Sequence, residues 1–122
     1  MGKKKILIVD DDKDVLSVLE KRLTVEKYSV ITANNGQDAI ILAKAQRPDL
    51  IILDIIMPGI DGAEVAGKLR EDPETKNIPV IFLTCMLTPE EEKQKRHHVA
   101  GNIFIAKPYD IKELLSEIKK IV

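Results

Sequence analysis

The sequence predicts an α/β fold in which parallel strands form a central sheet and helices cover both of its faces. Five short apolar runs, the last one weaker, recur along the chain: Ile6–Val9, Leu50–Leu53, Val80–Leu83, Ile103–Ala106 and Tyr28–Thr32. Apolar runs without polar alternation are typical of strands buried on both faces, as in a parallel sheet. Segments with helical character lie between the runs, so strand and helix alternate five times. This order indicates right-handed βαβ crossovers in one three-layer domain over residues 1–122.

The helices are indicated by apolar stripes and by capping residues. Apolar residues recur at helical spacing within residues 15–23 and again within residues 111–122. A capping side chain stands three residues before a carboxylate in Asp61–Glu64, Thr88–Glu91 and Asp110–Glu113. The segment Thr88–His98 begins like a helix but carries no apolar stripe. We therefore expect a short, mobile helix there.

The composition limits the classes of function. The chain is 44% hydrophobic, and its formal net charge is −1. With so small a net charge, no overall electrostatic field favours binding to nucleic acid or to a membrane surface. The single cysteine, Cys85, excludes an internal disulfide and suits a reducing compartment. No apolar run approaches the length of a membrane span or of a signal peptide. We expect a cytoplasmic protein that is a monomer or a weak oligomer.

Polar residues stand where the predicted strands end. Asp10–Asp12 follow the first strand and Asp54 follows the third. Thr84 follows the fourth strand, and Lys107 follows the fifth. In an open α/β sheet the carboxyl ends of the strands form the edge at which ligands bind. The carboxylates, the hydroxyl and the ammonium group are therefore predicted to meet at one edge.

Carboxylates gathered at one edge need a positive partner. Two of them about 4 Å apart repel by about 4 kcal/mol at an effective dielectric constant of about 20. An acidic site made of oxygen atoms suits Mg²⁺, which takes one or two carboxylates together with phosphate oxygens. Lys107 and Thr84 are suited to bind phosphoryl oxygens. Zinc is not favoured, because no cysteine and histidine set has ligand spacing.

These motifs together resemble the receiver domain of two-component response regulators. The resemblance rests on Asp10-Asp11, on "LDIIMPGIDG" at residues 53–62, on Thr84 and on Lys107-Pro108, and it covers essentially the whole chain. It implies a doubly wound (βα)5 fold of the flavodoxin and CheY type, with a five-stranded parallel sheet in the order 2-1-3-4-5. It also implies a signalling phosphoacceptor that assists its own phosphorylation and dephosphorylation, and not an enzyme.

The resemblance assigns a role to each site residue. Asp54 would accept a phosphoryl group from the phosphohistidine of a histidine kinase or a phosphotransfer protein. Asp11, Asp54 and the Ile56 carbonyl would bind Mg²⁺, with Asp10 acting mainly through water. Lys107 and Thr84 would bind the phosphoryl oxygens.

The resemblance also implies a switch. Thr84 and Phe104 match the family's switch positions, and they would alter the surface around residues 88–98, the fifth strand and the last helix. The downstream target is unknown, and a weak homodimer on activation is one expected form of output. Direct contact with nucleic acid or membrane is not expected.

Three other functions fit parts of the sequence. A phosphatase of the haloacid-dehalogenase kind would use Asp10 and Asp12 as paired acids, but it leaves Asp54 and the following Met57-Pro58 unexplained. A flavin-binding protein would need a Ser, Thr and Gly loop after the first strand, where this chain has acids. An adaptor that works without phosphorylation remains as an alternative, although the acids and the lysine are all present.

Overall fold

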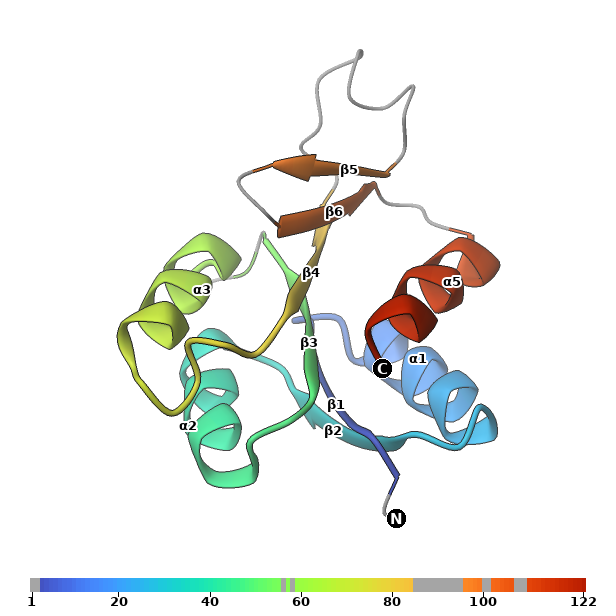
Figure 1. The fold of residues 1–122 in the computed structure, drawn as a ribbon, viewed down its shortest axis with the longest axis horizontal. Coiled ribbons are helices and arrows are strands. Elements are labelled where there is room, and N and C mark those ends of the chain that lie inside the picture. The colour runs from blue at the N-terminus through green and yellow to red at the C-terminus, as the bar shows by residue number, and fades with distance from the viewer. Residues whose placement is uncertain (1–2, 56, 58, 85–95, 100–101, 107–109) are drawn as a thin grey trace.

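The protein folds into a central sheet with helices on both faces (Figure 1). The structure, a computed structural model, describes residues 3–55, 57, 59–84, 96–99, 102–106 and 110–122. The strands are β1 (Lys5–Val9), β2 (Ser29–Ala33), β3 (Leu50–Asp54), β4 (Val80–Thr84), β5 (Arg96–Val99) and β6 (Asn102–Ala106). The helices are α1 (Lys13–Val25), α2 (Gly36–Gln46), α3 (Gly62–Glu71) and α5 (Ile111–Ile121). Helices α1 and α5 cover one face of the sheet, and α2 and α3 cover the other (Figure 1).

The sheet has the predicted parallel core and one additional strand. Its order is β2-β1-β3-β4-β6-β5, and every pair is parallel except β5 with β6. The predicted α/β fold and the parallel order 2-1-3-4 are confirmed, and the predicted fifth strand corresponds to β6, beside β4. The antiparallel edge strand β5 was not predicted.

The predicted helix over residues 88–98 is wrong at its end. Residues 96–98 belong to strand β5, while residues 85–95 lie outside the described part of the chain. The physical reason lies in the sequence, since a segment without an apolar stripe has no helix face to bury. Residues 96–99 instead pair their backbone with β6.

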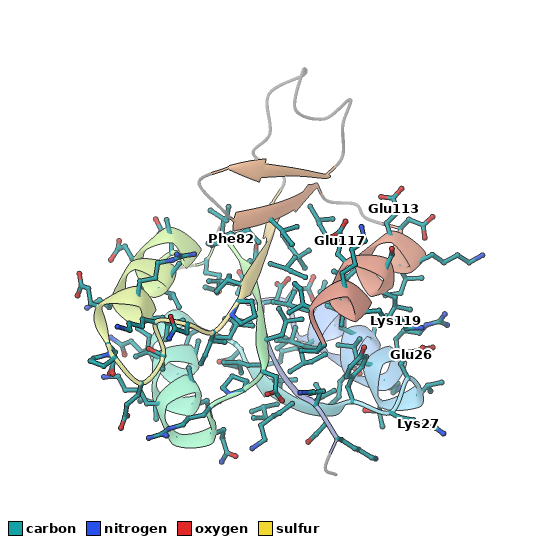
Figure 2. All side chains as sticks on the ribbon, in the orientation of Figure 1. Glu26, Lys27, Phe82, Glu113, Glu117 and Lys119 are labelled. Atoms are coloured by element: carbon teal, nitrogen blue, oxygen red, sulfur yellow. The ribbon has the colours of Figure 1, made fainter. Side chains whose placement is uncertain are left out.

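The core consists of two apolar layers, one on each face of the sheet. Alternate residues of a strand point to opposite faces. In β1, Ile6 and Ile8 join the cluster under α1 and α5, whereas Leu7 and Val9 join the cluster under α2 and α3. On the first of these faces, Glu26, the C-cap residue of α1, and Lys119 of α5 form an ion pair at 3.0 Å (Figure 2). Strand β3 is buried along its whole length, so its final residue is held by neighbours on both sides.

Side-chain caps start the described helices, and those of α3 and α5 stand at the predicted places. Asp61 accepts a hydrogen bond from the Glu64 N–H at 2.9 Å, which confirms the predicted start of α3. Asp110 starts α5, as predicted. Its carboxylate accepts a hydrogen bond from the Lys112 N–H at 2.8 Å, and this donor stands one residue before the predicted one, Glu113. Because each cap satisfies a helix N–H that has no partner inside the helix, it fixes where the helix begins. Among the described residues no helix is both long and apolar enough to cross a bilayer.

An ion pair between α2 and the end of α3 gives a pH-dependent contribution to stability. The Glu74 backbone N–H and the Lys44 ammonium, 3.1 Å from the carboxylate, hold the pKa of Asp72 below its ordinary value of 3.8. A group with a lowered pKa stabilises the fold above its unfolded-state pKa, and this contribution disappears as the pH falls through the lower folded-state value.

We therefore expect Asp72→Asn to lower the thermal midpoint at neutral pH. The amide oxygen can still accept from the Glu74 N–H, so the substitution mainly removes the charge that faces Lys44. The difference between the two proteins should disappear once the pH is below the folded-state pKa of Asp72. Thermal unfolding of both proteins across the acid range measures this, and an equal difference at every pH would contradict it.

Candidate phosphoacceptor site

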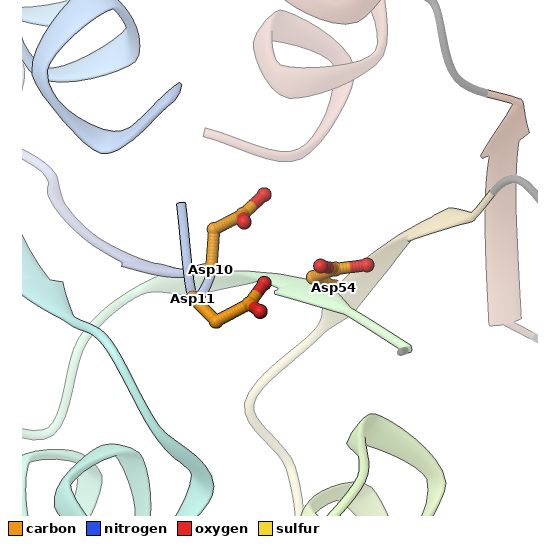
Figure 3. Close-up of side chains that lie close together, drawn as sticks. All are labelled: Asp10, Asp11 and Asp54. Atoms are coloured by element: carbon orange, nitrogen blue, oxygen red, sulfur yellow. The ribbon is translucent and has the colours of Figure 1, made fainter. Parts of the chain in front are cut away.

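Three carboxylates meet at the carboxyl ends of two neighbouring strands. Asp10 and Asp11 directly follow β1, and Asp54 is the last residue of β3. The two strands are parallel partners, with Val9 opposite Leu53, so their ends lie side by side. One oxygen atom from each carboxylate lies within 4.8 Å of the other two (Figure 3). The sequence-based expectation that these three acids lie together is therefore confirmed.

The three consecutive acids after β1 occupy different environments. Asp10 is 1% exposed, and its Oδ1 accepts a hydrogen bond from the Asp12 N–H at 2.9 Å. Asp11 is exposed. Asp12 caps α1 by accepting from the N–H groups of Asp14 and Val15. Since Asp12 serves as a helix cap, the pairing of Asp10 with Asp12 that a phosphatase of the haloacid-dehalogenase kind would need is not favoured.

The backbone on both sides of Asp54 is firmly held. Asp54 is only 5% exposed, and the next residue, Ile55, donates its N–H to the Leu83 carbonyl of β4 at 3.2 Å. The Ile55 carbonyl in turn accepts from the Gly62 N–H at 2.8 Å. A side chain at Gly62 would collide with the Asp54 carbonyl oxygen and lie 2.7 Å from the Ile55 Cα. The start of α3 is therefore packed directly against the backbone that carries the Asp54 carboxylate.

The chemistry of the donor set fits a hard divalent cation. Two unit negative charges 4.8 Å apart repel by about 3 kcal/mol at an effective dielectric constant of about 20. The site offers three carboxylates and no nitrogen or sulfur ligand among the described residues. Oxygen ligands of this kind, two of them buried and one exposed, suit Mg²⁺, which retains water molecules as part of its coordination. The residues present therefore fit a magnesium ion.

The remaining predicted site residues are described only in part. Ile56 and Lys107 lie outside the described residues. Thr84 ends β4, and its backbone lies at the same edge of the sheet, one position beyond the residue that pairs with Asp54. Phe104 lies in β6, where its backbone is in register with Phe82. The roles predicted for these four residues stay predictions.

Gly36 and Gly62 lie close to the chain that joins β3 to α3, a feature that the sequence reasoning missed. Each begins a helix, and in each a Cβ would collide with the chain between β3 and α3. Their neighbours Asn35 and Asp61 are recognisable as helix caps, and the glycines occupy the next position. That position marks where a helix starts, but it does not reveal which backbone the helix approaches.

Comparison with known proteins gives a consistent result. A family model described as the response regulator receiver domain matches residues 6–119. The response regulator PleD of Caulobacter vibrioides is 38% identical over 117 residues, which cover 96% of this chain and 26% of that protein. The probable transcriptional regulator ycf27 of Porphyra purpurea is 36% identical over 98% of this chain and 48% of its own length. The chain thus spans about half or less of these curated relatives.

Solved structures resemble the fold over its whole length. The chemotaxis protein CheY4 of Vibrio cholerae superposes with a TM-score of 0.85 at 28% identity, covering 99% of this chain and 100% of that one. The response regulator TrrA of Thermotoga maritima, solved in complex with Mg²⁺ and BeF, has a TM-score of 0.78 at 32% identity and covers 98% of this chain and 99% of that chain.

The acidic pocket and the family match lead to the same conclusion. A receiver domain is a signalling phosphoacceptor and not a classical enzyme, and an acidic pocket such as Asp10, Asp11 and Asp54 is typical of its phosphoacceptor site. With its parallel sheet, this pocket and a family match over residues 6–119, the chain belongs to the response regulator receiver domains of two-component systems.

Proposed function

We propose that Asp54 accepts a phosphoryl group from the phosphohistidine of a histidine kinase or a phosphotransfer protein. The observation that carries this proposal is the buried Asp54 carboxylate at the end of β3, within 4.8 Å of carboxylate oxygens from Asp10 and Asp11. Of the three acids, Asp54 alone comes from the central strand β3. Its backbone is held by Leu83 on one side and by the start of α3 on the other, so it is a rigidly positioned nucleophile.

We further propose that Asp11, Asp54 and the Ile56 carbonyl hold Mg²⁺, with Asp10 acting mainly through water. The all-carboxylate donor set supports this assignment, as does a 32% identical relative solved with Mg²⁺ and BeF. A bound magnesium ion would supply positive charge to the phosphoryl oxygens and offset the repulsion among the acids.

In the transfer itself, an Asp54 carboxylate oxygen attacks the phosphorus atom in line with the leaving nitrogen. A P–O bond forms, the P–N bond breaks, and its electron pair goes to the imidazole nitrogen, which takes up a proton. Burial of Asp54 limits the access of water to the resulting acyl phosphate. Lys107 and Thr84 bind the phosphoryl oxygens as donors, so that positioning and charge neutralisation provide most of the rate.

Phosphorylation is proposed to switch a nearby surface. An added phosphoryl group gives Thr84 and Lys107 a new anionic partner, and the end of β4 at Thr84 can move towards it. Phe104, in β6 beside β4, would follow this movement. The protein would then bind its downstream target through the surface of residues 88–98, β6 and α5. It would do so either as a monomer or as a weak homodimer. We place this phosphorelay signalling in the cytoplasm, without direct contact with nucleic acid or membrane.

Incubation with Mg²⁺ and a small acyl-phosphate donor should add one phosphoryl group to the wild type and none to Asp54→Asn. The reason is that an amide lacks the nucleophilic carboxylate oxygen. Intact-protein mass spectrometry measures the modification directly. Asp14→Asn, the same change at an exposed acid of the first turn of α1, is the matched control and should be phosphorylated like the wild type. Equal labelling of all three proteins, or labelling of none, would contradict the proposed function.

A further inference from the structure

Asp11, a proposed magnesium ligand, depends on its backbone for its place in the acidic cluster. Its side chain is exposed, and among the described residues no hydrogen bond or ion pair involves its carboxylate. It extends with the Asp10 side chain from the end of β1 towards Asp54 (Figure 3). Because the backbone angles decide which side-chain rotamers are allowed, the turn that contains Asp11 decides where its carboxylate lies.

The two neighbours of Asp11 close this turn around it. The Asp12 N–H donates a hydrogen bond to Oδ1 of Asp10 at 2.9 Å. An aspartate that accepts from the N–H two residues further on forms a closed turn, and Asp11 is the residue enclosed by this one. The backbone N–H of Asp10 donates to the carbonyl of Ala33, the last residue of β2, at 3.2 Å. The first end of the turn is thus fixed to the sheet.

Asp12 fixes the other end of the turn to α1. Its Oδ1 accepts from the Asp14 N–H at 2.9 Å and from the Val15 N–H at 3.4 Å. Its backbone carbonyl accepts from the Leu16 N–H at 3.1 Å, and three buried leucines hold α1 against the sheet. With its carboxylate and its carbonyl both bonded to the helix, the Asp12 N–H has a fixed direction. This N–H is the group that Asp10 accepts from.

We propose that Asp12 is a positioning residue that holds the turn around Asp11, so that the Asp11 carboxylate is already in place when Mg²⁺ arrives. The inference rests on the proposed function, because it takes Asp11 to be a magnesium ligand. The cluster of carboxylate oxygens within 4.8 Å does not include Asp12, so Asp12 acts through the backbone. Groups that orient metal ligands without touching the metal typically change affinity by about 10–100-fold when they are altered.

Asp12→Gly should bind Mg²⁺ about tenfold more weakly than Asp12→Asn, as measured by titration calorimetry. Both variants lack the negative charge, so any loss of affinity that comes from the charge is common to them. Asparagine caps a helix as well as aspartate does. Glycine leaves a helix start nearly as stable, but it makes no side-chain hydrogen bond and has a freer backbone. The affinity of Asp12→Asn should stay close to that of the wild type, because salt screens an exposed charge.

A second pair of variants separates positioning from helix stability. Asp12→Ala and Asn35→Ala each remove the cap of one helix, α1 or α2, and should lower the thermal midpoint by similar amounts. Only Asp12→Ala should also lose affinity for Mg²⁺, because the Asn35 side chain bonds to Asn34 and Asp38 and to no acid of the cluster. If Asp12→Ala does not fold, Asp12→Gly takes its place in this comparison.

Phosphorylation by a small acyl-phosphate donor gives an independent measurement. Asp12→Gly should need more Mg²⁺ than Asp12→Asn for half of its maximal rate. At saturating Mg²⁺ the rates of the two variants should be similar, because neither substitution alters Asp54 or its backbone partners. A lower rate of Asp12→Gly at saturating Mg²⁺, with an unchanged requirement for Mg²⁺, would contradict the positioning role.

The outcomes distinguish this inference from the proposed function. Equal affinities of Asp12→Gly and Asp12→Asn for Mg²⁺ would overturn the role of Asp12 and leave the proposed function standing. An equal loss of affinity in Asn35→Ala and Asp12→Ala would overturn it too, because loosening of any helix start would then be sufficient. Absence of Mg²⁺ binding in the folded wild type would overturn both proposals.

Discussion

In the presence of a metal chelator, we expect Asp54→Asn to be more stable than the wild type by about 1–2 kcal/mol. The substitution removes one of three negative charges whose oxygens lie within 4.8 Å of one another. Two charges at that separation repel by about 3 kcal/mol at an effective dielectric constant of about 20, and solvent around the exposed Asp11 screens part of this repulsion. Denaturant unfolding of both proteins gives the difference in the free energy of unfolding.

Magnesium should reverse this order of stability. A ligand that binds only the folded state stabilises it by about 2.7 kcal/mol at a hundred times its dissociation constant. Asp54→Asn lacks one of the three carboxylates, so the midpoint of the wild type should rise with added Mg²⁺ while that of Asp54→Asn changes little. Asp14→Asn controls for the change from carboxylate to amide and should follow the wild type at every Mg²⁺ concentration. If Asp54→Asn in chelator is only as stable as the wild type, or less stable, then repulsion among the three carboxylates does not dominate the stability of the site.

The second large effect concerns the strand that carries the phosphoacceptor. Ile52 is fully buried in β3, two residues before Asp54, and packs in the apolar layer under α1 and α5. Truncation of a buried isoleucine to alanine removes apolar burial and leaves a cavity, which together cost about 2–5 kcal/mol. We expect Ile52→Ala to lower the free energy of unfolding by such an amount, as measured by denaturant titration.

Ile41→Ala is the matched control for Ile52→Ala. Ile41 lies in α2 with 63% of its surface exposed, so its removal leaves little or no cavity. Alanine also has the higher helix propensity, so the variant should be as stable as the wild type or slightly more stable. Equal losses in the two variants would contradict the assignment of the core to the two faces of the sheet.

The elements that the sequence predicted well are those with a strong apolar signal. Strands β1, β3, β4 and β6 each contain a run of four apolar residues, as is typical of strands buried on both faces of a sheet. Helix α2 gives a weaker signal, because its buried face consists of Gly36, Ala39 and Ala43. Small side chains carry little hydrophobic periodicity even where they are fully buried. Strand β5 could not be predicted, because an edge strand depends on pairing with β6 and its four residues contain no apolar run.

The acidic cluster was predictable because strand ends have a fixed place in an open α/β sheet. Asp54 is far from Asp10 and Asp11 in sequence, yet two parallel neighbouring strands bring the three acids together. The division of roles among Asp10, Asp11 and Asp12 was harder to predict from the sequence, since it depends on which acid becomes the cap of α1. The contact of Gly36 with Ile60 could not be predicted either, because it joins the start of α2 to the chain before α3 through the packing of these two helices.

Titration calorimetry with Mg²⁺ is the most direct test of the central claim that the three carboxylates form a metal-assisted phosphoacceptor site. We expect saturable binding of one ion per wild-type chain, and much weaker binding by Asp11→Asn, which retains both buried acids. Circular dichroism on the same samples establishes that both proteins are folded. A folded wild type that takes up no Mg²⁺, or an Asp11→Asn variant that binds it as tightly as the wild type, would contradict the account.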